Sequence, residues 1–115
     1  MSEGYSYAPL GEVKTFSLDA PSGWTVFTST CYAIGRLVSI SVRFDTTSPT
    51  TAKIIVLENV IPSEYSVPYN MSACGFNNSS DKTLHCIISG RTINVYRPDT
   101  ENLNAIKVSF MYVLP

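Results

Sequence analysis

The alternation of apolar and polar side chains over residues 38–45 constrains the fold of this chain more than any other feature of its sequence. The even positions are apolar and the odd positions are polar: Val38, Ile40, Val42 and Phe44 against Ser39, Ser41, Arg43 and Asp45. Successive side chains of a strand point to opposite faces, so this pattern predicts a strand with one buried and one solvated face. No segment shows a sustained period of 3.6 residues, so the pattern gives no sign of helices.

Other short segments with the same character, separated by turn signals, predict about seven or eight strands in all. We expect further strands at 13–18, 28–34, 53–57, 71–76, 83–89, 92–97 and 105–113. Turns are expected at 21–23, 35 and 90–91, loops at 45–51, 77–81 and 98–104, and an irregular crossing segment at 63–70. This spacing is typical of an all-β fold, an antiparallel β-sandwich or a Greek-key barrel.

The length of 115 residues suits one hydrophobic core and is too short for two independent cores. A hydrophobic content of 44% is enough for a packed core and excludes intrinsic disorder. Residues 1–20 are expected to be an N-terminal arm or linker that holds the first short strand, because Gly4, Pro9 and Gly11 interrupt a polar stretch. Residues 21–115 are expected to form the β-sandwich domain.

Charge and polarity exclude several classes of partner. The formal net charge is −1, and the lysines and arginines stand singly, so binding to nucleic acid is not expected. No apolar run approaches the ~18 residues of a membrane span, and the first residues lack the features of a secretory signal, so synthesis in the cytoplasm without membrane insertion is expected. Charged residues make up only 15% of the chain, which is instead rich in serine and threonine, as suits a virion or lectin-like surface.

The sequence offers little for catalysis or metal binding. His85 is the only histidine, and in a strand it points away from Leu84 and Cys86, so it lacks a neighbouring nucleophile. The cysteines, Cys31, Cys74 and Cys86, are scattered and odd in number, which argues against a zinc site or a complete disulfide framework. We therefore expect no catalytic residue, no metal, no cofactor and no enzyme activity.

Two groups of residues carry the side-chain types that bind saccharides. Sugars present apolar C–H faces and hydroxyl groups, so their sites combine aromatic rings with polar side chains. One group is Tyr96, Arg97 and Asp99, and the other is Tyr69 with Asn70. These five residues are the predicted binding residues, and the alternative is that they are ordinary surface and turn residues.

Three predicted strands are apolar on both faces, although a two-sheet sandwich of this size covers only one face of each sheet. Either a loop or the N-terminal arm covers the second face, or identical subunits meet there. For the second case we expect the interface to include Ile55, Leu57, Ile87, Met111 and Val113.

The order of several features resembles the C-terminal head domains of bacteriophage tail fibres and receptor-binding proteins. The features are Trp24, the turn Ile34-Gly35 into the strand 37–44, Val60-Ile61-Pro62 followed by Tyr65 and Pro68, the Gly90 hairpin, and the final segment Val108-Ser109-Phe110-Met111-Tyr112. The resemblance covers residues 24–112 and depends mostly on turn and core positions.

The resemblance implies a homotrimeric β-sandwich or jelly-roll tip in the virion, on the tail or a head appendage, which binds host-surface saccharide and other virion proteins. Two alternatives stay open. One is a structural virion protein, such as a head-fibre or capsid-decoration domain, and the other is a secreted carbohydrate-binding module or small lectin.

Overall fold

The computed structural model describes residues 12–50, 52–77, 82–97 and 103–115, and the all-β prediction is confirmed in them. Their regular structure consists of strands and one short 3₁₀ turn, η1, at Ser63–Tyr65. The strands are β1 (Val13–Phe16), β2 (Thr25–Ile34), β3 (Leu37–Thr50), β4 (Ile54–Leu57), β5 (Val67–Asn77), β6 (Lys82–Gly90), β7 (Thr92–Tyr96) and β8 (Leu103–Val113).

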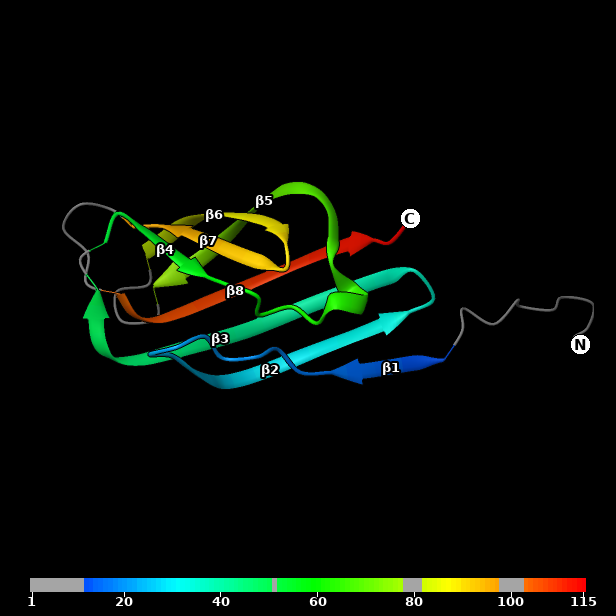
Figure 1. Ribbon diagram of the computed structural model, residues 1–115, viewed down its shortest axis with the longest axis horizontal. Helices are drawn as coiled ribbons and strands as arrows, with labels where there is room; N and C mark the ends of the chain where they lie inside the picture. Colours follow the sequence, from blue (N-terminus) through cyan, green and yellow to red (C-terminus); the bar gives the residue numbers. More distant parts are fainter. Residues whose placement is uncertain (1–11, 51, 78–81, 98–102) are drawn as a thin grey trace, which may run out of the picture.

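The eight strands form one antiparallel sheet with the order β1-β2-β3-β8-β5-β6-β7-β4. Its two halves, β1-β2-β3-β8 and β5-β6-β7-β4, meet where residues 75–77 of β5 pair with residues 106–108 of β8. Beyond this short junction β5 turns away from β8, and the sheet curls into a half-barrel (Figure 1). The architecture is thus sandwich-like, although a single sheet supplies both layers.

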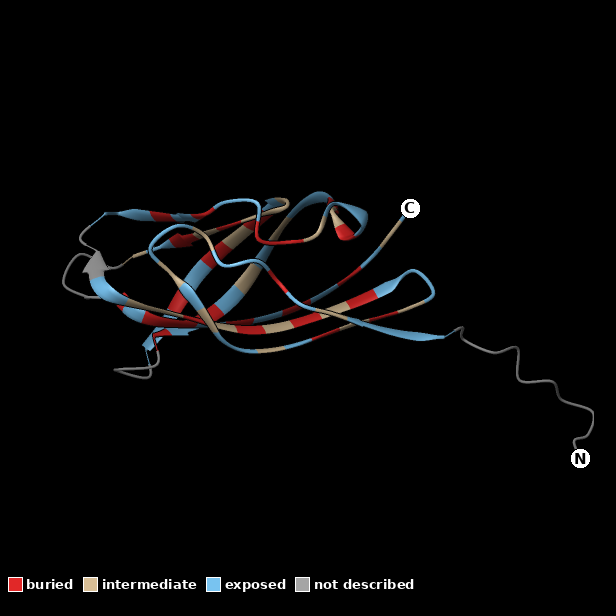
Figure 2. Cartoon of the chain, turned by 60° about the horizontal axis from the view of Figure 1, so that its bottom comes forward, coloured by how far each residue is buried: buried red, intermediate tan, exposed pale blue. Residues whose placement is uncertain are grey.

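The core lies on the concave side of this curled sheet, where buried and exposed residues alternate along the strands (Figure 2). The apolar positions of the alternating segment are all inward and at most 2% exposed: Val38, Ile40, Val42 and Phe44. The neighbouring strand β8 contributes Ile106, Val108, Phe110 and Tyr112, and β6 and β7 of the other half contribute Leu84, Cys86, Ile88, Ile93 and Val95. The period-two pattern therefore identified the buried face correctly.

The predicted tight turns are confirmed. Two residues separate the last paired positions of each hairpin, Ile34 with Leu37 and Ser89 with Thr92, and the first of the two is Gly35 and Gly90 respectively. These glycines have φ angles of +58° and +59°, which residues with a Cβ rarely adopt. In the earlier turn, the Trp24 N–H donates to the Pro21 carbonyl at 3.0 Å, and Gly23 has a φ of +86°.

Three predicted irregular segments are wrong, because strands extend into them. β3 continues through the predicted loop 45–51 as far as Thr50, and β8 already begins at Leu103. The predicted crossing segment 63–70 contains η1 and then the start of β5 at Val67. Pairing is irregular in the β3 and β5 extensions, so their side chains do not alternate cleanly and the sequence pattern does not reveal them.

The segments that follow β1 and β4 close the open side of the half-barrel. The Asp19 N–H donates to the Val60 carbonyl at 2.9 Å. The ring of Phe16 stacks on the ring of Tyr65, with 4.1 Å between centroids. The buried Tyr112 hydroxyl donates to the Tyr65 carbonyl, and burial raises the pKa of Tyr112. These contacts fix the η1 segment against β8.

On β4 the structure corrects the residues chosen for the subunit interface. Ile55 is 5% exposed and Leu57 is 0% exposed, so both belong to the core of the chain itself. Their neighbours Ile54 and Val56 point outward and are 45% and 53% exposed. A strand that is apolar on both faces does not indicate which face is inward, and the prediction chose the wrong one. The other predicted interface residues lie on the convex face, with Ile87 partly exposed and Met111 and Val113 about half exposed.

Candidate functional site

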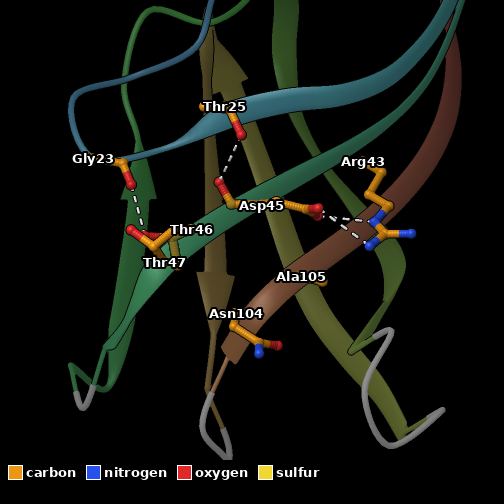
Figure 3. A pocket seen from close by; sticks show the side chains of 8 residues that line it. All are labelled: Gly23, Thr25, Arg43, Asp45, Thr46, Thr47, Asn104 and Ala105. Atoms are coloured by element: carbon orange, nitrogen blue, oxygen red, sulfur yellow. Dashed lines mark hydrogen bonds and ion pairs between the residues drawn. The ribbon is translucent and has the colours of Figure 1, made fainter.

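The candidate site is a polar cavity of about 320 Å³ where β2 begins, β3 bends and β8 begins (Figure 3). It is lined by Gly23, Thr25, Arg43, Asp45, Thr46, Thr47, Asn104 and Ala105. Strand register brings these residues together, because Asp45 pairs with Thr25 of β2 on one side and with Ala105 of β8 on the other. Three strands therefore converge on Asp45.

Arg43 and Asp45 form a two-pronged ion pair at this cavity. Residues two apart on a strand share a face, so the two side chains lie side by side. The Arg43 Nε–H donates to Asp45 Oδ1 at 2.8 Å, and Arg43 Nη2 donates to Asp45 Oδ2 at 3.2 Å. Both side chains are about a quarter exposed, at 25% and 27%. The pair is thus preorganised and still accessible to a ligand.

Threonine hydroxyls fix the backbone around the ion pair. Thr46 Oγ1 donates to the Gly23 carbonyl at 2.7 Å and accepts from the Ser48 N–H at 3.2 Å. Thr25 Oγ1 donates to the Asp45 carbonyl at 3.3 Å. These bonds tie the turn before β2 to the bent part of β3, so the cavity wall is held from both sides (Figure 3).

An exposed aromatic ring borders the ion pair. The register of β2 shifts between Val26 and Thr28, and this bulge leaves Phe27 between the paired positions. Phe27 is 61% exposed, and the Arg43 guanidinium carbon lies 4.0 Å from its ring centroid. Bulges often redirect side chains at functional sites, and here the bulge places an aromatic ring beside a charged, hydrogen-bonding group.

The cavity suits a neutral ligand with many hydroxyl groups. Arg43 and Asp45 neutralise each other, and the carboxylate would repel an anion that approached the guanidinium. The guanidinium donates, the carboxylate accepts, and the Asn104 amide does both. Among the described residues that line the cavity, Asp45 is the one that carries a carboxylate.

Two of the predicted binding residues, Tyr96 at the end of β7 and Arg97 directly after it, lie outside this cavity. Tyr96 is 38% exposed, and its ring centroid is 5.4 Å from that of His85. The Arg97 Nε–H donates to the Ala52 carbonyl at 2.8 Å, so the guanidinium ties the end of β7 to the start of β4. Asp99 lies outside the described residues. The local evidence thus gives Arg97 a structural role.

Tyr69 and Asn70 are both exposed near the start of β5, and they do not join Tyr96. The start of β5 lies beside Gly90, at the end of β6, whereas Tyr96 pairs with His85 five residues earlier on β6. Tyr69 and Asn70 therefore lie at a different place on the sheet from Tyr96, and none of these three residues lines the cavity at Asp45.

The structure also pairs an exposed thiol with the only imidazole, which sequence reasoning missed. As predicted, His85 and Cys86 point to opposite faces of β6, with His85 exposed and Cys86 buried. The register of β5 and β6 places Cys74 directly opposite His85, and both line a shallow hollow of about 440 Å³. The described residues contain no cluster of three or more potential metal ligands, so this pair alone does not make a metal site.

The three cysteines are expected to react at very different rates with a thiol reagent. Cys74 is exposed, whereas Cys31 and Cys86 are buried, and burial raises the pKa of the Cys86 thiol to about 11. One thiol per chain should react quickly with DTNB, and the other two at least ~100-fold more slowly until the protein unfolds. The fast phase should vanish in a Cys74→Ser variant. Two fast thiols in the native protein would contradict the assigned burial.

One part of the cavity could have been found from the sequence, and another could not. Arg43 and Asp45 occupy alternate positions of the predicted strand, so their shared polar face was already visible. The contribution of Asn104 depends on β8 lying beside β3, which no local pattern reveals. Phe27 depends on a bulge, which has no sequence signature here.

In the described part of the chain, no helix is long and apolar enough to cross a bilayer. The chain matches no protein-family model and no curated protein sequence.

Proposed function

We propose that this chain is a saccharide-binding attachment domain, the jelly-roll-like tip of a phage tail fibre or head appendage, and that it acts as a homotrimer in the virion. The observation that carries the saccharide assignment is the neutral Arg43–Asp45 pair, which lies beside Asn104 and the exposed ring of Phe27. The resemblance of residues 24–112 to tail-fibre head domains supports the virion assignment.

The mechanism follows from the shape and chemistry of the cavity. Sugar hydroxyls exchange hydrogen bonds with Arg43, Asp45 and Asn104, while an apolar sugar face packs against Phe27. A single shallow site of this kind binds weakly. Linking several sites in one rigid oligomer raises the apparent affinity for a repetitive surface by ~10²–10⁴-fold.

The proposal is tested with a glycan array, followed by calorimetry on the best glycan. Asp45→Asn and Arg43→Gln should each weaken binding by about 10–100-fold, because each removes a charge-assisted hydrogen bond. Their thermal stability should fall only modestly, because a partly buried ion pair of this kind contributes about 1–2 kcal/mol. Tyr69→Ala serves as the control, because Tyr69 is exposed and lies outside the cavity.

The results separate this function from its alternatives. Equal binding by the wild-type protein and both ion-pair variants would place the site elsewhere, and a loss in Tyr69→Ala alone would favour the site on β5. If the intact protein binds no glycan but sediments with purified capsids, it is a structural virion protein.

A further inference from the structure

We propose that a second copy of this chain packs on the convex face of the sheet, over an apolar belt formed by Val13, Ile34, Leu37, Met111 and Val113. This inference deepens the proposed function, whose avidity needs more than one copy, by naming the surface through which the copies meet.

Strand register lines up four of these residues in one row. Val13 pairs with Ile34, Ile34 with Leu37, and Leu37 with Val113, so the row crosses β1, β2, β3 and β8. Paired residues share a face of the sheet. Val13, Leu37 and Val113 are 59%, 38% and 50% exposed, and Met111 in the next row is 53% exposed. The convex face therefore exposes a continuous strip of apolar side chains to solvent.

The adjoining rows carry no charge either. The second row contains Thr15, Tyr32, Ser39 and Met111, and the third contains Thr30, Ser41 and Ser109. Charged side chains appear only in the fourth row, where Arg43 pairs with Lys107. Strands ~4.8 Å apart with ~3.4 Å per residue give these rows a footprint on the order of 300 Å². That is enough for the core of a standard contact, which buries about 800 Å² on each partner once its polar rim is counted.

A free strand edge lies at the same place. β5 pairs with β8 only at residues 106–108, so in the described part of the chain residues 109–113 have a strand partner on the β3 side alone. Proteins normally protect such an edge with lysine, proline or a covering segment, because it can pair with another strand. No charged residue lies between Ser109 and Val113. A neighbouring molecule can cover the belt and this edge together.

The character of the face favours an identical copy as that molecule. Contacts between unlike proteins use charge complementarity to select the partner, whereas contacts between identical subunits are more apolar. Three rows without a charged residue fit a contact between identical subunits. The belt also lies at the opposite end of β3 from the cavity, since Leu37 and Asp45 are eight residues apart. Asp45 lies two rows beyond Ser41, the last of the uncharged rows, so a contact centred on the Leu37 row can leave the cavity open.

Sedimentation velocity across about 1–100 µM tests the inference without any glycan. The wild-type protein should sediment as a multiple of 12.6 kDa. A Leu37→Glu, Val113→Glu double variant should dissociate at least 100-fold more readily and keep a wild-type circular dichroism spectrum. The matched control is Ile54→Glu, Val56→Glu, which changes two outward residues of β4 with similar exposure and should stay oligomeric.

A second measurement covers the case in which the belt variant does not fold. In a Cys74→Ser background, Val113→Cys should be cross-linked between chains by a short bismaleimide, and Ile54→Cys should not. A wild-type monomer at 100 µM, an oligomer that persists in the folded belt variant, or equal cross-linking at both positions would overturn the inference. Such a result would leave glycan binding by the cavity intact, and loss of glycan binding would leave the belt intact.

Discussion

Replacing Phe44 with alanine is expected to lower the free energy of unfolding by about 3–5 kcal/mol, because the deleted ring leaves a cavity that the surrounding sheet cannot fill. Phe44 is 0% exposed and lies on the inward face of β3, between Val26 of β2 and Ile106 of β8. Both neighbours belong to paired strands, so the backbone has little freedom to collapse inward. Urea denaturation at one fixed protein concentration measures the loss.

The chain offers a matched control in Phe27, which is the same residue type at a 61% exposed position. Phe27→Ala loses the contact with Arg43 but leaves no internal cavity, so it should cost less than about 1 kcal/mol. Equal losses in the two variants would mean that the two rings are equally buried and that the assigned inward face of the sheet is wrong.

Substitutions at Gly75 should have the second large effect, because this glycine lies at the junction of the two half-sheets. A Cβ at this position would lie 3.0 Å from Cys86 Sγ and 3.1 Å from the Lys107 carbonyl oxygen. Gly75→Val adds two methyl groups beyond a Cβ that is itself already too close to its neighbours. We therefore expect the free energy of unfolding to fall by about 3 kcal/mol or more. Gly75→Ala should lose less, about 1–2 kcal/mol.

A double-mutant cycle shows which neighbour matters. Cys86→Ala removes the sulfur atom, so Gly75→Ala should cost less in that background than in the wild-type protein. Ser72→Val is the control for placing a branched side chain on β5, since Ser72 is exposed on the outer face, and it should be nearly neutral. If Gly75→Val melts at the wild-type temperature, the close approach of β5 and β8 is not as described.

The alternation of apolar and polar residues predicted the buried face correctly where a strand has one solvated face. The alternation around Ile40 and Val42 identified the buried face, and the glycine-first loops at Gly35 and Gly90 located two hairpins. These features depend on the chain within a few residues, so they are visible without knowing the fold.

The pattern failed where the structure depends on distant strands. β4 is apolar on both faces, so its sequence does not indicate which face is buried. Leu57 was predicted at a subunit interface, but it lies in the core of the chain. The candidate cavity needs β8 beside β3, so that Ala105 pairs with Asp45, although the two are sixty residues apart in sequence. Strand order of this kind is fixed by the whole sheet.

The pairing of Val13 and Val113 into one row has a practical consequence for handling this protein. The first residue of β1 and the last residue of β8 lie at the same end of the sheet, about 27 Å along β3 from Asp45. A biotin tag joined through a flexible linker beyond Val13 or Val113 should leave the Arg43 side of the molecule facing the flowing sample, whereas a linkage on either valine itself would block the belt where the copies are proposed to meet.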